Sequence, residues 1–127
     1  MKDFWNERYA DKDYVYGQAP NKYFKEKIDE MQPGKILLPA EGEGRNAVYA
    51  ARLDWDVSAF DISEKGKEKA QNLANEQSVK IDYKVGDLPE LDYKDEQFDV
   101  IALIFAHFSE EKKENYLKKF KKLLKRG

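Results

Sequence analysis

Residues 36–61 read ILLPAEGEGRNAVYAARLDWDVSAFD, and this stretch decides the fold. An apolar run precedes a glycine-bearing turn at Glu41 to Gly44, and the residues after the turn have the composition of a helix. A second apolar run follows and ends on Asp61. This order of elements, in which a strand, a tight turn and a helix precede a second strand that ends on an acid, is the βαβ arrangement that holds a nucleoside. The stretch therefore predicts a ligand that carries an adenosine.

Length and composition limit the possible classes of protein. The chain has 127 residues, which is the size of one domain, and its 41% hydrophobic and 13% aromatic content argues against disorder. A net charge of −2 gives no general attraction to nucleic acid or membrane. Without cysteine there is no disulfide or thiolate site, and the one histidine, His107, excludes a His-rich metal site. The N-terminus is too charged for a signal peptide, and no apolar run approaches the roughly 18 residues of a membrane helix. We expect a soluble cytoplasmic protein with no metal, nucleic-acid or membrane partner.

Hydrophobic periodicity predicts alternating helices and strands. The expected strands are 35–40, 56–61, 79–85 and 98–105, and the expected helices are 3–9, 21–31, 44–53, 63–76 and 109–126. The strand at 79–85 alternates apolar and polar residues, so we expect it to be half exposed. The strand at 98–105 is almost wholly apolar, which is typical of a central parallel strand covered on both faces. The order predicts an α/β fold with a mainly parallel sheet.

The turn itself carries a glycine motif and two acids. Gly42 to Ala47 matches G-x-G-x-x-A, although such turns also occur for purely structural reasons. Glu41 and Glu43 would repel a pyrophosphate but suit a ligand with a positive group. S-adenosylmethionine has an ammonium, a carboxylate and a sulfonium. An acid at the end of the first strand can hold its ammonium, while free N–H groups of the following helix take its carboxylate.

Two further acids follow predicted strands. Asp61 lies 19 positions after Gly42, close to the about 20 expected of a ribose-binding acid. A plain role as a helix cap ahead of Ser63 remains an alternative, and the two roles can coexist. Asp87 follows the third strand and can accept from an adenine amino group, while a neighbouring N–H donates to a ring nitrogen. The alternative is an ordinary Asp-containing turn.

The last third of the chain offers a possible substrate region and a basic helix. Phe105 to Phe108 fall at the carboxyl end of the fourth strand, where open α/β sheets place ligands. His107 can orient or deprotonate a substrate there, or it can be structural. The last helix has an apolar stripe opposite eight basic residues. We interpret it as a sheet-covering helix with a solvated face, with nucleic-acid or anionic-membrane binding as the alternative.

With these residues in place, the chain resembles the class I S-adenosylmethionine-dependent methyltransferases. It is most similar to the small group of tellurite-resistance and thiopurine methyltransferases. The resemblance runs from Trp5 to the end, through the segments WNERYADKDYVYGQAPN, EGEGRNA, SAFDIS, VGDLPEL, FDVIALIFAHF and LLKRG. It implies a Rossmann-like three-layer α-β-α sandwich with strand order 3-2-1-4. Residues 1–127 would form a single domain, with 1–34 as an N-terminal cap segment and helix and 35–127 as the cofactor-binding units.

The resemblance also implies the cofactor, the reaction and the site. S-adenosylmethionine would donate a methyl group to a small nucleophile, a thiol or a tellurite- or selenite-like oxyanion. Gly42 and Gly44 would approach the methionine portion, Asp61 would bind the ribose, and Asp87 and Leu88 would bracket the adenine. The expected cofactor-binding residues are Glu41, Gly42, Gly44, Asn46, Asp61, Ile62, Asp87, Leu88 and Phe105. The expected substrate-contacting residues are Trp5, Tyr16, His107 and Phe108, with Trp5 and Tyr16 in a segment that folds over the site.

The chain departs from the family pattern in two places. The family usually shows Asp-Leu-Gly-Cys-Gly where this chain has Leu38-Pro39-Ala40-Glu41-Gly42, so we expect Glu41 to replace the missing acid. Family members continue into three more strands, whereas this sequence ends at Gly127, which indicates a fragment or a minimal version. Without a next strand, Val100 to Phe105 would be an exposed apolar edge. That edge predicts a homodimer or a missing C-terminal segment.

Two other functions remain open at this stage. A nicotinamide-dependent reductase would share the glycine motif and Asp61, but its usual Tyr-x-x-x-Lys occurs only at Tyr23 to Lys27, before the glycine turn. A non-enzymatic cofactor-binding or oligomerisation fragment is the other alternative.

Overall fold

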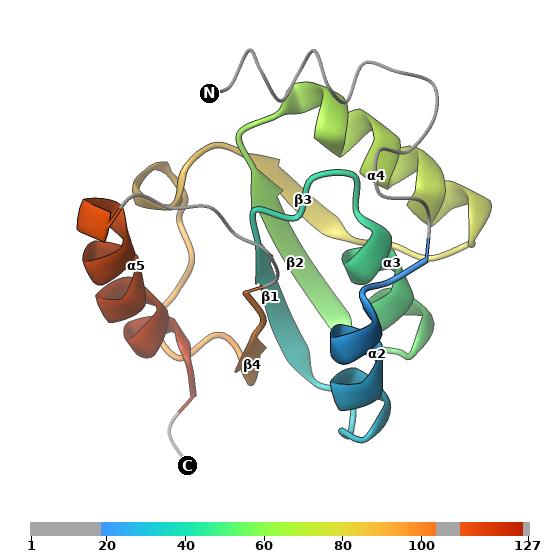
Figure 1. The fold of residues 1–127 in the computed structure, drawn as a ribbon, viewed down its shortest axis with the longest axis horizontal. Helices are drawn as coiled ribbons and strands as arrows, with labels where there is room; N and C mark the ends of the chain where they lie inside the picture. Colours follow the sequence, from blue (N-terminus) through green and yellow to red (C-terminus); the bar gives the residue numbers. More distant parts are fainter. Residues whose placement is uncertain (1–18, 104–109, 126–127) are drawn as a thin grey trace.

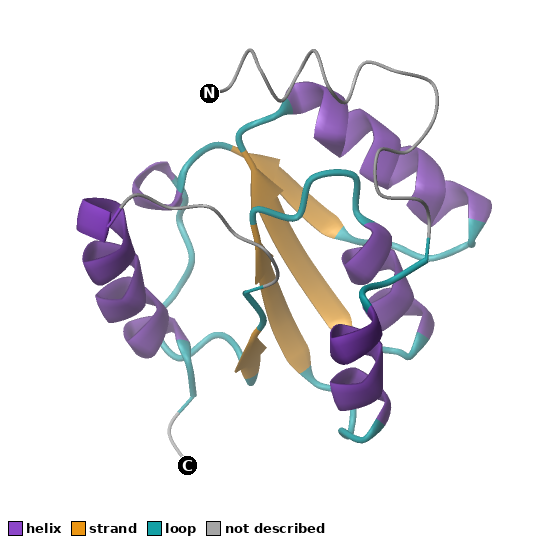
Figure 2. Ribbon diagram, viewed as in Figure 1, coloured by secondary structure: helices purple, strands orange, loops and turns teal. Residues whose placement is uncertain are grey.

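The computed structural model describes residues 19–103 and 110–125, which form a four-stranded parallel sheet between helices (Figure 1). The strands lie in the order β3-β2-β1-β4, and every neighbouring pair is parallel. This confirms the predicted α/β fold and strand order. The elements, in chain order and coloured by type in Figure 2, are α2 Lys22–Asp29, β1 Lys35–Pro39, α3 Arg45–Arg52, β2 Asp56–Asp61, α4 Glu64–Glu76, β3 Asp82–Val85, the 3₁₀ helix η1 Leu88–Glu90, β4 Val100–Ile101 and α5 Glu110–Leu123.

Alternation along the strands builds two cores, one on each face of the sheet. Ile36 and Leu38 of β1 pack with α2, α3 and α4, whereas Leu37 between them packs with α5 on the opposite face. Successive side chains of a strand point to opposite faces, so one apolar strand serves both cores. Figure 1 shows the result as three layers, with α5 on one side of the sheet and α2, α3 and α4 on the other.

Local capping signals set the helix ends. The Asn21 side chain accepts from the N–H of Phe24 at 3.0 Å, and Ser63 Oγ accepts from the N–H of Gly66 at 3.0 Å. The observed α4 therefore begins directly after Ser63, as predicted. Helices α2 and α3 form within the predicted ranges and end one or two residues earlier. The helix expected at 3–9 lies outside the described residues.

The predicted third strand begins too early. Residues 79–81 are not part of β3, because the C-terminal turn of α4 extends into this segment. Ser78 has a positive φ of 58°, and the N–H of Val79 donates back to Ala74 O at 3.0 Å. Within β3 itself, Tyr83 is buried and Asp82 is exposed, so the expected half exposure is confirmed.

The predicted fourth strand is wrong in length and environment. β4 comprises only Val100–Ile101, and both residues are half-buried instead of covered on both faces. Among the described residues it pairs with β1 only, so it is an edge strand of this sheet, as expected in the absence of a next strand. Backbone hydrogen bonds at Asp99 and Ala102, of 2.8 and 3.0 Å, frame this short pairing. Leu103 beyond it is 46% exposed.

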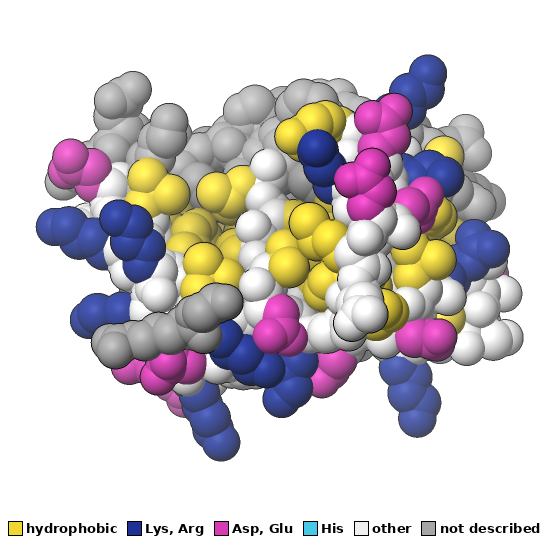
Figure 3. Space-filling view, turned by 90° about the horizontal axis from the view of Figure 1, so that it is seen from below, with side chains coloured by type: hydrophobic (Ala, Val, Ile, Leu, Met, Phe, Trp, Pro, Cys, Tyr) yellow, Lys and Arg dark blue, Asp and Glu magenta, His cyan; other side chains and the backbone are white. Residues whose placement is uncertain are grey.

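The two ends of the sheet differ in character. In Figure 1 the carboxyl ends of the strands point upward, toward the turn between β1 and α3. Figure 3 views the opposite end, where acidic and basic side chains are interspersed around apolar patches. Within the described part of the chain, no helix is long and apolar enough to cross a membrane.

Candidate functional site

The carboxyl ends of β1, β2 and β3 bring the predicted acids to one edge of the sheet. The register pairs Pro39 with Phe60 and Asp61 with Val85, so the three strands end side by side. Glu41 follows β1, Asp61 is the last residue of β2, and Asp87 follows β3. The juxtaposition expected from the sequence is therefore present.

Asp61 braces the glycine turn. The residue is 8% exposed, and its two carboxyl oxygens accept from the N–H of Gly42 at 2.9 Å and of Ser63 at 3.1 Å. Burial raises the pKa of Asp61, while these N–H groups and that of Ile62 oppose the rise. Ser63 itself is the cap of α4, so the alternative role of Asp61 as that cap is not observed. A carboxylate can accept about four hydrogen bonds, which leaves capacity for a ligand hydroxyl.

The glycines of the turn are needed for conformation and packing. Gly42 and Gly44 have φ values of 63° and 86°. A Cβ at Gly44 would lie 2.5 Å from the Cβ of Ala70, so only glycine lets α3 begin this close to α4. The hydroxyl of Tyr83 donates to Gly42 O at 2.5 Å, which holds the turn from β3. Gly44 therefore has a structural role whatever the turn binds.

Glu41 binds the backbone N–H groups that we expected to bind a ligand carboxylate. Its Oε1 accepts from the N–H groups of Asn46 at 2.9 Å and Ala47 at 2.8 Å, at the N-terminus of α3. The expectation that these groups are free for the ligand is therefore wrong in this structure. Oε2 has no hydrogen-bond partner among residues 19–103 and 110–125. Burial raises the pKa of Glu41 to about 7, and the nearby Asp61 adds to the rise.

Glu43 does not offer its charge to a ligand as expected. Its carboxylate lies 2.8 Å from Lys69 Nζ of α4, and both side chains are largely buried, at 4% and 12% exposure. The positive charge of Lys69 balances Glu43, so the pair ties the turn to α4. No local pattern predicted this partner, because Lys69 lies 26 positions away on a separate helix.

Asn46 supports the chain where it enters α2. Its Oδ1 accepts from the N–H of Asn21 at 2.8 Å, and its side chain is buried. Neighbouring Arg45 donates to Ala19 O at 3.5 Å. Both contacts were missed by sequence reasoning. A contact of the Asn46 side chain with the cofactor would compete with its bond to Asn21.

The side chain of Asp87 accepts hydrogen bonds that were not predicted from the sequence. Its Oδ1 accepts from the N–H of Leu88 at 2.9 Å and from the hydroxyl of Tyr116 on α5. The Leu88 N–H, which we expected to donate to an adenine ring nitrogen, is therefore engaged by Asp87. Leu88 is 1% exposed and packs in the core beneath α5. Tyr116 belongs to the apolar stripe of the last helix, and that stripe alone does not predict a bond to Asp87.

Other predicted site residues cannot be placed. Trp5, Tyr16, Phe105, His107 and Phe108 all lie outside the described residues. Ile62 is half-buried between Asp61 and Ser63. In the described ranges, no group of three or more His, Cys, Asp or Glu side chains is arranged to hold a metal ion.

Residues 36–127 match a family model described as a methyltransferase domain. The chain belongs to this family. Its domain is a class I S-adenosylmethionine-dependent methyltransferase domain, whose family cofactor is S-adenosylmethionine. A comparison with curated proteins gave no match.

Similar solved structures support the fold. One, from a study of the conversion of a disulfide bond into a thioacetal group during echinomycin biosynthesis, has a TM-score of 0.85 at 21% identity, covering 100% of this methyltransferase domain and 57% of that chain. Haemonchus contortus phosphoethanolamine N-methyltransferase 1 has a TM-score of 0.74 at 19% identity, with coverages of 98% and 29%. Magnesium protoporphyrin IX methyltransferase from Synechocystis PCC 6803 has a TM-score of 0.72 at 19% identity, and the match covers 97% of this chain and 66% of that chain. The domain thus spans less than two thirds of each of these chains, and identities this low show the fold alone.

The charges at the edge fit this cofactor. Glu41 and Asp61 are two carboxylates close enough for the charge of one to raise the pKa of the other. A ligand with an ammonium and a sulfonium would relieve that repulsion, and Glu41 Oε2 is placed to accept from the ammonium. Asp61 and Asp87 would hold the ribose and adenine portions.

Proposed function

We propose that this domain binds S-adenosylmethionine at the carboxyl edge of β1, β2 and β3 and transfers its methyl group to a small, soft nucleophile. One observation carries the proposal. The carboxylates of Glu41 and Asp61 lie together at the glycine turn, and burial raises the pKa of each. Acids with raised pKa values in one small region are typical of a functional site, and a bound cation would stabilise their charged forms. When bound, S-adenosylmethionine supplies a methyl group on a positively charged sulfur.

The chain's own contribution is to bind, orient and exclude water. Asp61 fixes the turn through Gly42 and keeps acceptor capacity for a ribose hydroxyl. Glu41 presents one oxygen to the ammonium while the other holds the start of α3. A thiolate or an oxyanion needs no general base, so alignment and a dry site would supply most of the acceleration. A role for His107 in orienting the acceptor stays a prediction.

The acceptor class rests on the sequence resemblance. The segments EGEGRNA, SAFDIS and VGDLPEL resemble the tellurite-resistance and thiopurine methyltransferases, whose acceptors are a tellurium oxyanion and a thiol. We therefore propose a thiol, or a selenite- or tellurite-like oxyanion, as the methyl acceptor of this domain.

Calorimetric titration with S-adenosylhomocysteine tests cofactor binding, with NADH as a parallel control. We expect the wild-type chain to bind S-adenosylhomocysteine with micromolar affinity and not to bind NADH, and we expect Asp61→Ala to lose the binding of S-adenosylhomocysteine. Asp56→Ala is the matched control, because Asp56 is an exposed acid at the opposite end of the same strand. Circular dichroism of both variants separates lost binding from lost folding. A folded wild-type chain that does not bind S-adenosylhomocysteine would refute the proposal.

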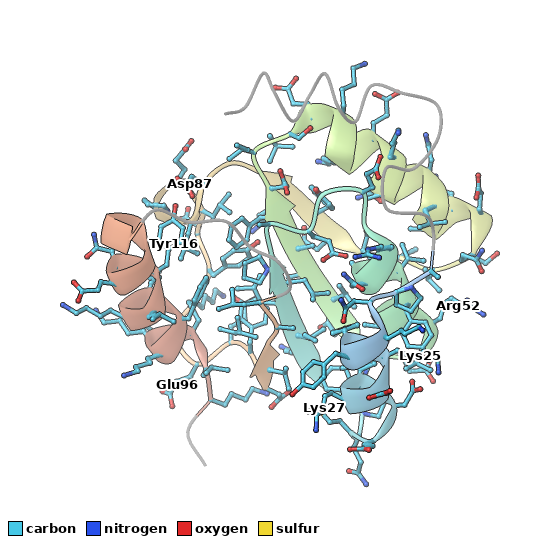
Figure 4. All side chains as sticks on the ribbon, viewed as in Figure 1. Lys25, Lys27, Arg52, Asp87, Glu96 and Tyr116 are labelled. Atoms are coloured by element: carbon cyan, nitrogen blue, oxygen red, sulfur yellow. The ribbon has the colours of Figure 1, made fainter. Side chains whose placement is uncertain are left out.

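A screen of acceptors then separates an enzyme from a cofactor-binding module. Methylation of a thiol, selenite or tellurite supports transfer, whereas binding without turnover on any of them supports the non-catalytic alternative. The reductase alternative gains nothing from the structure. Tyr23 is 69% exposed on α2, and Figure 4 shows Lys27 at the end of that helix far from the carboxyl edge of the sheet.

We also propose that the β4 edge pairs with a second copy of the chain. In the part of the chain that the structure describes, β4 has a strand neighbour on one side only, and Leu103 next to it is 46% exposed. Of the expected edge Val100 to Phe105, the structure describes the first four residues. Sedimentation equilibrium tests this: a concentration-dependent dimer that Leu103→Lys disrupts supports the pairing, and a monomer at all concentrations contradicts it.

A further inference from the structure

We propose that Tyr116 of α5 is a positioning residue for recognition of the adenine, because it holds the carboxyl group of Asp87 in place. This inference rests on the proposed function. Figure 4 shows Asp87 and Tyr116 beside each other, at the point where η1 faces α5. The hydroxyl of Tyr116 donates to Oδ1 of Asp87 across 29 positions of sequence.

The carboxyl of Asp87 is held both by its own turn and by α5. In a capping box, the Asp87 side chain accepts from the N–H of Glu90, and Glu90 Oε1 accepts from the N–H of Asp87 at 3.4 Å. The N–H of Leu88 and the Tyr116 hydroxyl both donate to the same oxygen, Oδ1. Two donors on one oxygen set the plane of the carboxyl group. Asp87, Leu88 and Tyr116 also line a cleft of about 290 Å³ between η1 and α5, so a ligand can reach this wall.

Tyr116 is itself rigid enough to act as a support. It is 4% exposed and packs edge-on against Phe120, with ring centroids 6.2 Å apart. Burial raises the pKa of Tyr116 well above its ordinary value, and the bond to Asp87 and the charges of Asp87 and Glu90 add to the rise. The hydroxyl therefore keeps its proton across the physiological range and serves as a donor.

The consequence concerns ligand specificity. A fixed carboxylate accepts from the 6-amino group of adenine but repels the 6-oxo group of hypoxanthine. Without the Tyr116 hydroxyl, Asp87 keeps its charge and the N–H donors of its own turn, but its carboxyl loses the donor that α5 contributes. Tyr116 thus acts through Asp87, and its removal should reduce discrimination between the two purines, not only overall affinity.

The test compares Tyr116→Phe with Tyr93→Phe. Tyr93 is a matched control because it is buried in the same core as Tyr116, and its hydroxyl has no hydrogen-bond partner among the residues that the structure describes. Calorimetry measures the Kd of S-adenosylhomocysteine and of S-inosylhomocysteine for each variant. We expect Tyr116→Phe to weaken S-adenosylhomocysteine about tenfold and to reduce its preference over the inosine analogue by a similar factor. Tyr93→Phe should leave both constants within about twofold.

Several outcomes would overturn the inference. It fails if Tyr116→Phe weakens both ligands equally, or weakens neither. Asp87→Asn provides a second measurement that does not depend on the folding of the Tyr116 variant. This substitution should also erase the preference, and adding Tyr116→Phe to it should then change little. Wild-type chain that does not bind S-adenosylhomocysteine refutes the proposed function and the inference together, whereas binding with an unchanged preference refutes the inference alone.

Discussion

Replacing Glu41 by glutamine should make the domain more stable at neutral and alkaline pH. Burial raises the pKa of Glu41 from an ordinary 4.5 to about 7, so ionisation is costlier in the folded than in the unfolded chain. At about 1.4 kcal/mol per pKa unit, this rise corresponds to about 3 kcal/mol. Glutamine removes the charge, but its carbonyl oxygen can still accept from the N–H groups of Asn46 and Ala47.

The sign follows from the raised pKa. Below pH 4.5 Glu41 is neutral in both states and imposes no penalty; as the pH rises to about 7, the penalty grows to its full size. Wild-type protein should therefore lose up to about 3 kcal/mol more stability than Glu41→Gln between pH 4.5 and 8. The raised pKa of Asp61 contributes in the same direction, but it is present in both proteins and largely cancels.

Urea unfolding at pH 5 and pH 8 measures this difference. Glu76→Gln is the control, since Glu76 is exposed in the last turn of α4 and its replacement should not change the pH dependence. Parallel stability curves for wild type and Glu41→Gln would refute the reasoning. So would a variant that is less stable than wild type at pH 8, because that result would mean that the charge of Glu41 stabilises the start of α3.

Further predictions concern the same turn. Ala40 has a φ of 52°, and this conformation costs a non-glycine residue about 1–2 kcal/mol. Ala40→Gly should therefore raise the unfolding free energy measured in urea by about 1 kcal/mol, once the entropy cost of the added glycine is subtracted. Lys69→Met should destabilise by about 3 kcal/mol, since it removes the cation from the largely buried ion pair with Glu43; adding Glu43→Gln should recover most of the loss. Binding of S-adenosylhomocysteine near pH 7 should release a proton from Glu41, seen as a buffer-dependent binding enthalpy that Glu41→Gln abolishes.

The parts of the fold that could be predicted are those with local signals. β2 and α4 have the predicted ranges because an alternating apolar run and a serine cap lie within a few residues of the ends they determine. The strand order followed from the family resemblance and not from any local pattern. The length and burial of β4 were predicted wrongly, because an apolar run has the same appearance in a long covered strand and in a short edge strand. Only its neighbours in space distinguish the two.

The site shows the same division. The convergence of Glu41, Asp61 and Asp87 was predictable, because parallel strands place their carboxyl ends at one edge. Their partners were not, since Lys69 and Tyr116 come from helices 26 and 29 positions away and carry no motif. The bond of Glu41 to the start of α3 is local, because Glu41 lies only five residues before the N–H group from which it accepts. This bond was therefore predictable from the sequence, although we predicted a ligand contact for Glu41 instead.

The contact between Gly44 and Ala70 limits how this sequence can vary. A methyl group at position 44 would overlap the methyl of Ala70, which is itself fully buried, so the two positions share one volume. A larger side chain at position 70 would push α4 away from α3, and with it the Lys69 that anchors the turn. A redesign of α4 for stability or solubility should therefore leave position 70 as alanine or glycine, and the neighbouring exposed positions of the helix, such as Glu68, are the ones free to change.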